Sequence, residues 1–595
     1  MIATPDSGVW PLFLARMILG LAISLAGTAL AVEPFFAPAS TSGSIQVQLV
    51  PTEVVTPGGN RLVTFGVPFP RGSLSVAGLS TLRVLRNGVE IPAHVDSMTP
   101  WRHRLNAALD GTSVRVARIQ ITYAFAGTVA EPITVAWGGP ARVLDVPALV
   151  SARSGWHTVT SGSYVAADNV QEPDVYAVLP KDWLGMGALR GTRNAPFDAT
   201  NLEARDNPST NAAIEHWPAY LEADRAAKNN FYSLVNQDSG AVTVANQCHY
   251  KTDFEPWLYD RAASMFALYF RSGFHASLRE AVRASDFYTD HVNASGFFDL
   301  KDGDTKYVYA ENLAYRYWLT GDDTALNRLA AIVTAQAGFG DNWTPGTGFW
   351  TERHAAFKLL ANQISYEING GSQASAVSTL VGRLVAHQNG ANGQIPQPPG
   401  YVDGGLYHLG SQHDGDWADN SFGASSWMSV LVVDAMLRAY STSEDPAIAN
   451  FIRRMGNFLR ASTINTTDHG YDNFNGPLAL PRYAMLSNGS DGQVDASDVE
   501  HALDVASGLA WANYFAEMTQ QTDSRLAETA EDLYFTYDEG VNFWIRPNGP
   551  ASGLPAYRVS PWRKYGWEHR VSGGLGWATL AATATQDALF ENGFD

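Results

Sequence analysis

A helical hairpin pattern recurs along the C-terminal part of this 595-residue chain. In each copy an apolar helix that carries aromatic residues ends in a short polar turn, and an amphipathic helix follows. Units of this kind stack because each buries its apolar stripe only against its neighbours. The pattern therefore predicts an (α/α) toroid over residues 248–590, with copies of the hairpin near Phe266, Tyr317, Ile368, Ala435 and Tyr514.

The preceding region alternates apolar and polar residues, which is typical of half-buried strands. The alternation is clearest in LVTFGVPF, LRVLRNGVEIPAHV and VRVARIQITYAFA, and Asn87-Gly88 divides the second run as a hairpin turn would. We predict an antiparallel β barrel or sandwich over residues 45–142 and further strands up to residue 247. The predicted fold class is thus multidomain α and β, with a β barrel or sandwich followed by the toroid.

Both ends of the chain carry short segments outside these two domains. Arg16 precedes an apolar run that ends in Ala29-Leu30-Ala31, so residues 1–31 are predicted to form a secretory signal peptide. Residues 32–44 are expected to form a leader, and residues 591–595 an acidic-aromatic tail. No second run of about 18 apolar residues follows. We expect a secreted or periplasmic protein that leaves the membrane after signal cleavage.

Composition narrows the class of partner. The formal net charge of -19 argues against nucleic acid, because nucleic-acid-binding domains present a basic face. It does not exclude an acidic glycan, since a few Arg and Lys side chains can dominate a cleft. The 17 Trp residues suit the flat apolar faces of sugars and, equally, the interfaces between helices. Cys248 is the only cysteine, so no internal disulfide is expected.

Polar and aromatic residues cluster mostly before or within the first helix of each hairpin. The clusters lie at residues 248–257, 306–312, 350–354, 407–417, 498–501 and 562–570, and five of them contain a histidine. Because the inner helices of a toroid converge on its axis, these clusters are predicted to share one cleft. The alternative is that they are separate surface and interface residues, and any single member of a cluster can instead pack or cap a helix.

Two reactions suit such a cleft. Uronate β-elimination needs a base, a cation or amide for the carboxylate, and an acid for the leaving oxygen. The candidates are His413 or His354 as base, Arg353 or Lys564 as neutraliser, and Tyr309 or Tyr565 as acid. Hydrolysis needs two carboxyl groups, one of them kept protonated. The carboxyl candidates are Glu311, Glu352, Asp414 and Glu568.

The predicted site residues fall into two groups. The predicted catalytic residues are His413, Tyr309, Glu311, Arg353, Glu352 and His354. The predicted substrate-binding residues are His249, Tyr250, Trp350, Trp417, Lys564, Tyr565, Glu568 and His569. We expect His413, Tyr309, Glu311 and Glu352 to approach one cavity.

No metal ion or cofactor is assigned from the sequence. Asp414 and Asp416 form an acidic pair in a Gly-rich loop, a pattern that is usually a solvated turn. A segment resembles the second half of a calcium loop through Asp491, Asp495 and Asp498. Its first carboxylate positions hold Ser487 and Gly489 instead, so calcium is only an alternative. No metalloprotease, phosphate-loop or dinucleotide motif is convincing, and no nucleophile elbow is present.

The order of domains resembles that of the exo-type rhamnogalacturonan lyases, in which a RIFT-type barrel precedes an (α/α) toroid. The segments GVPFPRGSLSV and LRVLRNGVEIPAHV resemble the barrel, and AENLAYRYWLTGDD is similar to inner-helix turns of toroidal glycan enzymes. The resemblance covers residues 45–590 in architecture. It implies lyase activity, but its motifs are shared with hydrolases and no catalytic residue is carried over from it.

The predicted function is therefore that of a secreted carbohydrate-active enzyme. We expect a polysaccharide lyase that cleaves a uronate-containing glycan by β-elimination. The alternatives are an inverting glycoside hydrolase on the same scaffold and a non-catalytic glycan-binding protein. The partner in each case is a polysaccharide or oligosaccharide.

Overall fold

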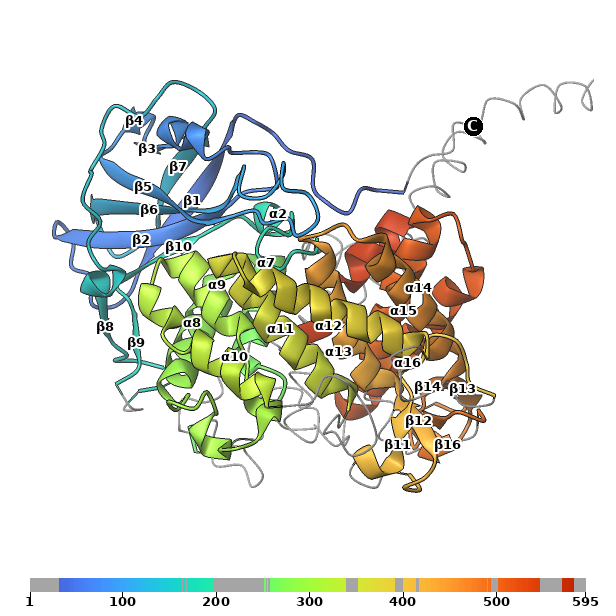
Figure 1. Cartoon of the computed structure of the whole chain (residues 1–595). Coiled ribbons are helices and arrows are strands. Elements are labelled where there is room, and N and C mark those ends of the chain that lie inside the picture. Colours follow the sequence, from blue (N-terminus) through green and yellow to red (C-terminus); the bar gives the residue numbers. More distant parts are fainter. Residues whose placement is uncertain are drawn as a thin grey trace, which may run out of the picture.

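The chain combines antiparallel sheets in its N-terminal region with helices in its C-terminal region, which confirms the predicted mixture of α and β structure (Figure 1). The computed structural model describes residues 32–162, 164–165, 169–195, 251–252, 254, 257–338, 351–390, 400–413, 417–472, 474–489, 491–493, 501–545 and 570–582. The predicted signal peptide and the tail lie outside the described residues. Among the described helices, none combines the length and apolar character that a membrane crossing requires.

The N-terminal region contains two large antiparallel sheets. One has the strand order β10-β1-β7-β3-β4 and the other the order β2-β6-β5. Inward-facing Val47 and Leu49 of β1 and Val63 and Phe65 of β2 are buried in the apolar core of this region. The strands are β1 (Gly43–Pro51), β2 (Asn60–Pro68), β3 (Arg83–Arg86), β4 (Val89–Glu90), β5 (Ala93–Pro100), β6 (Val114–Ala124), β7 (Glu131–Trp137), β8 (Trp156–Thr158), β9 (Gln171–Pro173) and β10 (Val175–Val178).

The predicted turn at Asn87-Gly88 is confirmed. It joins β3 to β4, with Arg86 paired to Val89. Asn87 and Gly88 have φ angles of 52° and 79°. A two-residue hairpin turn with positive φ at both positions matches the twist of the strands, and Asn-Gly is the pair that adopts it most readily.

Two successive helices occur at each position where a helical hairpin is predicted, and they pack on each other in every pair except the second, in which the later helix packs mainly on the first helix of the third pair. The pairs are α7 (Arg261–Ser272) with α8 (His275–Asp290), α9 (Glu311–Thr320) with α10 (Leu329–Ala337), α11 (Glu352–Asn369) with α12 (Gln373–Gln388), α13 (Ser426–Tyr440) with α14 (Pro446–Ala461), and α15 (Ala502–Met518) with α16 (Ser524–Ile545). Gly273 and Gly321 end α7 and α9 at φ angles of 65° and 69°. Glycine adopts this left-handed conformation without a steric penalty, so the chain turns there.

The first helices of the pairs, α7, α9, α11, α13 and α15, contact one another in sequence order. A short 3-10 helix, η9 (Ser572–Gly574), contacts both α15 and α7. Two small sheets are inserted between the pairs. Their strands are β11 (His408–Leu409), β12 (Phe422–Ser425), β15 (Ala484–Leu486) and β16 (Asp491–Gln493) in one sheet, and β13 (Thr463–Thr466) and β14 (Leu478–Pro481) in the other.

The remaining elements are short. They are α2 (Lys181–Leu184), η1 (Ala77–Thr81), η2 (Ala152–Gly155), η4 (Asp299–Lys301), η5 (Thr305–Tyr307), η6 (Asp323–Leu326) and η7 (Gly410–Gln412). Of these, η5 lies directly before α9, and η7 directly follows β11.

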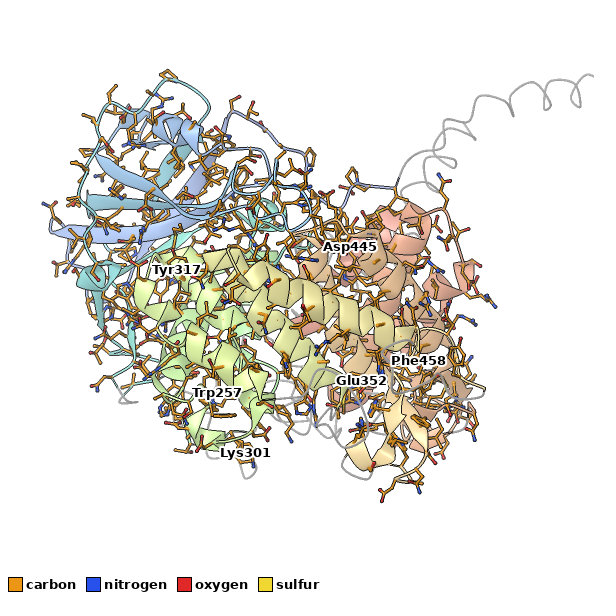
Figure 2. The ribbon with its side chains drawn as sticks, in the orientation of Figure 1. Trp257, Lys301, Tyr317, Glu352, Asp445 and Phe458 are labelled. Carbon is orange, nitrogen blue, oxygen red and sulfur yellow. The ribbon has the colours of Figure 1, made fainter. Side chains whose placement is uncertain are left out.

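The β region packs on the C-terminal ends of the first helices. The fully buried Arg115 of β6 forms an ion pair of 2.9 Å with Glu367 near the end of α11. Tyr317 and Asp445, near the ends of α9 and α13, lie toward the β region in Figure 2, whereas Glu352 lies toward the opposite side. The N-terminal end of α11 therefore lies away from the β region.

Gly66 of β2 allows this close packing. A Cβ atom at this position would lie 1.7 Å from the carbonyl oxygen of Trp318 on α9. We expect Gly66→Ala to lower the free energy of unfolding by about 2–3 kcal/mol, because the strand and the helix must separate. The measurement is urea denaturation. Gly127→Ala is the control, since nothing lies within 4 Å of the added Cβ, and an equal loss in both variants would contradict the packing argument.

A buried carboxylate, Glu172 of β9, connects the β region to α8. It accepts hydrogen bonds from Arg279 and Arg283, and His157 lies 3.5 Å from it. Burial lowers the pKa of His157, but Asp174 and Glu172 outweigh burial and raise this pKa to about 9. Because the folded-state pKa exceeds the unfolded value, the charge on His157 stabilises the fold at low pH, and this contribution is lost as the pH rises through 9.

We therefore expect His157→Gln to lower the free energy of unfolding by about 1–2 kcal/mol near pH 6. The difference from the unsubstituted protein should disappear near pH 10, where the imidazole is neutral in both states. Urea denaturation of the two proteins at both pH values measures this. A loss of the same size at both pH values would show that His157 acts through packing alone.

Candidate functional site

The N-terminal ends of several first helices meet in one place. Tyr259 precedes α7, and its hydroxyl accepts a hydrogen bond of 3.0 Å from Arg353 of α11. The Tyr259 ring packs edge-on against Trp427 of α13, with 5.8 Å between centroids. Trp427 in turn stacks on His501, the residue before α15, at 4.4 Å and 6°. Four segments that are distant in the sequence thus contribute side chains to one cluster.

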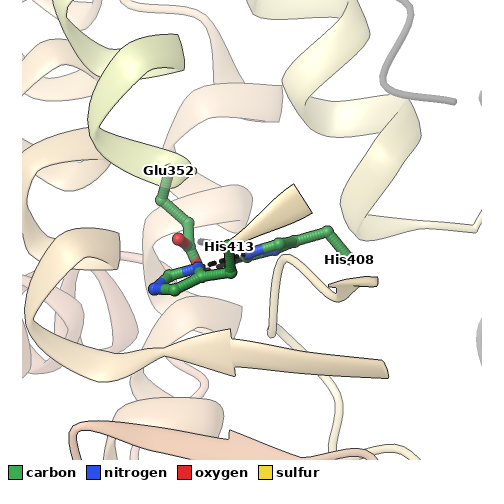
Figure 3. Close-up of side chains that lie close together, drawn as sticks. All are labelled: Glu352, His408 and His413. Atoms are coloured by element: carbon green, nitrogen blue, oxygen red, sulfur yellow. Dashed lines mark hydrogen bonds and ion pairs between the residues drawn. The ribbon is translucent and has the colours of Figure 1, made fainter. Parts of the chain in front are cut away.

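Beside this cluster, Glu352, His408 and His413 lie together (Figure 3). Glu352 is the first residue of α11, and its Oε1 accepts a hydrogen bond of 2.7 Å from the backbone N–H of Ser425. His408 lies on β11, and its Nε2 is 2.8 Å from Nδ1 of His413. The two imidazole rings are stacked, and Trp417 packs against both of them.

Burial dominates the electrostatics of these groups. It raises the pKa of Glu352 to about 8, against smaller opposing effects of the Ser425 N–H and Arg353. It also lowers the pKa of His408 well below its ordinary value, and a neighbouring imidazole, His413, adds to this. His354 behaves in the same way, because burial and the nearby cations Arg353 and Lys306 all lower its pKa. These groups are therefore mostly neutral near pH 7.

A strained turn holds Tyr259 in place. Tyr259 and Asp260 are consecutive residues with φ angles of 69° and 64°. Left-handed conformations cost non-glycine residues about 1 kcal/mol or more each and persist only where the surroundings enforce them. Here the Tyr259 N–H donates to the Tyr309 hydroxyl at 2.7 Å, and the Asp260 carboxylate caps α7 at the N–H of Ala263. The strain therefore marks this turn as a candidate functional feature.

Tyr309, a predicted catalytic residue, is buried behind this turn. Its hydroxyl accepts from the Tyr259 N–H and donates to the carbonyl oxygen of Lys306. Burial raises its pKa well above the ordinary value of tyrosine. Both hydrogen bonds go to backbone groups, so the geometry assigns Tyr309 to holding the turn that carries Tyr259.

Glu311, another predicted catalytic residue, lies in a buried ion-pair network. Its carboxylate accepts hydrogen bonds from Arg438, at 2.9 Å, from Tyr315, at 3.0 Å, and from Arg570. Burial raises the pKa of Glu311, but Arg570, Arg438 and Arg190 outweigh it and lower this pKa. Its contacts differ from those of Glu352 and His413, and they keep it ionised.

We expect Glu311→Gln to lower the free energy of unfolding by about 3–5 kcal/mol, because two buried guanidinium groups lose their counter-charge. Thermal and urea denaturation measure this loss. Glu528→Gln on the exposed face of α16 is the matched control and should change stability by less than about 0.5 kcal/mol. Stability equal to that of the control would contradict the network and favour a purely catalytic Glu311.

The other predicted residues are placed as follows. The Nδ1 atom of His354 lies 2.8 Å from the hydroxyl oxygen of Thr351. The Trp417 ring packs on the His413 ring, with 4.4 Å between their centroids. Asp491, one of the alternative calcium ligands, lies on β16. The remaining predicted site residues and alternative ligands lie outside the described residues: His249, Tyr250, Trp350, Asp414, Asp416, Asp495, Asp498, Lys564, Tyr565, Glu568 and His569.

Sequence reasoning missed Tyr259 and Trp427 and did not select His408. His408 carried a usable signal, since it precedes His413 by five residues in a short extended segment. Tyr259 carried only a weak signal, the helix-capping Asp260 that follows it. Trp427 lies inside an apolar helix, where a tryptophan is ordinarily a core residue.

Comparisons of the chain with models of known protein families, with curated proteins and with solved structures found no match. The resemblance to exo-type rhamnogalacturonan lyases therefore stays a prediction.

Proposed function

We propose that this protein is a carbohydrate-active enzyme, a polysaccharide lyase that cleaves a uronate-containing glycan by β-elimination. The observation that carries the proposal is the hydrogen bond from Arg353 to Tyr259 at the meeting point of the first helices. β-Elimination next to a carboxylate needs a cation for that carboxylate and a group that moves a proton. Arg353 and Tyr259 provide these two groups side by side.

Arg353 has donors left for a substrate carboxylate. A guanidinium carries five N–H donors. One nitrogen, Nη1, contacts Tyr259, whereas Nε has no hydrogen-bond partner among the described residues. A planar guanidinium with unused donors binds a carboxylate with two parallel hydrogen bonds. We assign Arg353 to the uronate carboxylate, whose charge grows as the neighbouring proton leaves.

Tyr259 is assigned to proton transfer. A guanidinium that donates to a phenol oxygen stabilises negative charge on it, the form that accepts a proton. In the proposed step Tyr259 Oη takes the proton from the carbon next to the carboxylate. A carbon–carbon double bond forms, the bond to the leaving glycosidic oxygen breaks, and that oxygen receives the proton from Tyr259. Atoms and charges balance without any further reactant.

The exposure of the surrounding residues supports access from one side. Tyr259 and Trp427 are buried, whereas Arg353 and Tyr483 are partly exposed. The Tyr483 ring lies 5.8 Å from Trp427 and 6.3 Å from His413. We propose that the glycan approaches past Tyr483 and Arg353, because aromatic rings suit the apolar faces of sugar rings.

The proposal includes the finer architecture. The contacts from α7 through α15, and from η9 back to α7, support closure of the helices into an (α/α) toroid. The contact between β10 and β2, which belong to different sheets, supports a RIFT-type barrel. Secretion or export to the periplasm, after cleavage of a signal peptide at residues 1–31, is part of the same proposal.

The decisive experiment incubates the mature protein with a panel of pectic, algal and bacterial acidic glycans. A lyase releases unsaturated ends that absorb in the ultraviolet. New reducing ends without this absorbance would overturn the lyase proposal in favour of an inverting glycoside hydrolase. Glycan binding without either product would leave a non-catalytic glycan-binding protein.

Once a glycan that the protein cleaves is identified, the variant Tyr259→Phe tests whether Tyr259 is the base. It keeps the ring but removes the proton-transferring oxygen, so we expect kcat to fall by about 100-fold or more. Tyr401→Phe is the control, because Tyr401 is exposed and its printed ring contact is with Tyr407, which has no assigned role in the reaction. Arg353→Lys keeps the charge but loses the planar donors, and should raise KM. Undiminished kcat in Tyr259→Phe would exclude Tyr259 as the base.

A further inference from the structure

We infer that Glu352, His408 and His413 form a binding site for a divalent metal ion of the zinc class. One ligand atom from each residue lies within 4.8 Å of the others, and all three residues are buried. A carboxylate with two imidazoles is a donor set that zinc and neighbouring transition metals favour, whereas calcium and magnesium prefer oxygen ligands. This inference stands on these residues and does not depend on the proposed reaction.

The orientation of His408 is that of a metal ligand. Its Nδ1 lies 3.0 Å from the carbonyl oxygen of Leu406. A carbonyl oxygen only accepts, so Nδ1 carries the hydrogen and Nε2 carries the lone pair. Metal-bound histidines commonly donate their second nitrogen to a backbone carbonyl in this way, which fixes the tautomer and the ring.

The lone pair of His408 points at the second histidine. His408 Nε2 lies 2.8 Å from His413 Nδ1. In the metal-free protein this contact is an N–H···N hydrogen bond in which His413 donates. When His413 adopts its other neutral tautomer, both nitrogens present lone pairs to the same point. Ligand atoms around a tetrahedral zinc ion lie about 3.3 Å apart, so the rings need to separate only slightly.

The carboxylate of Glu352 lies beside the two imidazoles, with Oε1 3.9 Å from His408 Nδ1, and it has one unused oxygen. Oε1 accepts the Ser425 N–H, whereas Oε2 has no hydrogen-bond partner among the described residues although the side chain is fully buried. A buried oxygen without a partner costs about 1–3 kcal/mol. Figure 3 shows this carboxylate directed toward the two imidazoles, where a metal ion would satisfy it.

One hydrogen-bonded unit holds the three ligands. β11 pairs with β12 so that His408 lies opposite Gly423, and β12 ends at Ser425, which binds Glu352. Trp417 covers both imidazoles, and a Cβ atom on Gly423 would lie 2.8 Å from its indole. These surrounding groups hold the carboxylate and the imidazoles in place and limit the access of water to them. Three protein ligands leave a fourth position for water or a substrate oxygen.

The described residues contain one other such group, Glu53, His157 and Glu172. There both oxygens of Glu172 already accept hydrogen bonds from Arg279 and Arg283. These guanidinium groups neutralise the carboxylate and would repel a cation. Among the described residues, Glu352 and the two histidines therefore form the group suited to a cation.

The test is metal binding by the mature protein, after chelation and dialysis have removed any metal ion already bound. Calorimetric titration with Zn²⁺ should give about one ion per chain, and elemental analysis after gel filtration should agree. Binding should also raise the unfolding temperature, since a ligand that prefers the native state stabilises it. Co²⁺ in place of Zn²⁺ should give the visible absorption of a tetrahedral site with nitrogen and oxygen ligands.

Three single substitutions, Glu352→Gln, His408→Gln and His413→Gln, should each weaken binding by 10-fold or more. Circular dichroism shows whether each variant folds. His94→Gln in the β region is the matched control and should bind as the unsubstituted protein does. Absence of Zn²⁺ binding by the unsubstituted protein would overturn the inference. Binding retained by all three folded variants would do the same, because the ion would then lie elsewhere.

Discussion

The structure depends on a buried chain of alternating charges. Arg115 of β6 contacts Glu367 of α11, Glu367 contacts Arg438 of α13, and Arg438 contacts Glu311 of α9. Each contact spans 2.7–2.9 Å within the protein interior. Isolated charges cannot be buried at such depth, so each member requires the others. The chain therefore fixes the β region and three first helices in one relative position.

This arrangement separates the stabilising chemistry from the candidate reactive chemistry. The ion pairs of Glu367 and Arg438 lie along the first helices toward the β region. Tyr259, Arg353, Glu352 and the two histidines lie at the helix starts, where inserted small sheets add side chains. A rigid attachment at one end leaves the other end to be built by insertions, which vary more easily than helices do.

The sequence predicted those parts of the molecule whose determinants are local. Apolar periodicity and turn glycines such as Gly273 locate the hairpins, and Asn87-Gly88 locates a β turn. The ion-pair network of Glu311 could not be predicted, because its arginine partners are distant in the sequence, at positions 438 and 570. Glu352 lies beside His408 because β11 pairs with β12. Strands this short show too little alternation of apolar and polar residues for their pairing to be predicted. The left-handed turn at Tyr259 was least predictable, because non-glycine residues avoid that conformation.

The direction of the first helices has an electrostatic consequence. Helices α11, α13 and α15 begin at the candidate site, and α7 begins just behind Tyr259, so the positive ends of their backbone dipoles converge there. Each helix start behaves as about half a positive charge for groups close to it. The chain carries a net charge of -19, yet this convergence gives the site a local field of the opposite sign. An anionic ligand repelled by the surface as a whole would thus find an attractive potential at the helix starts.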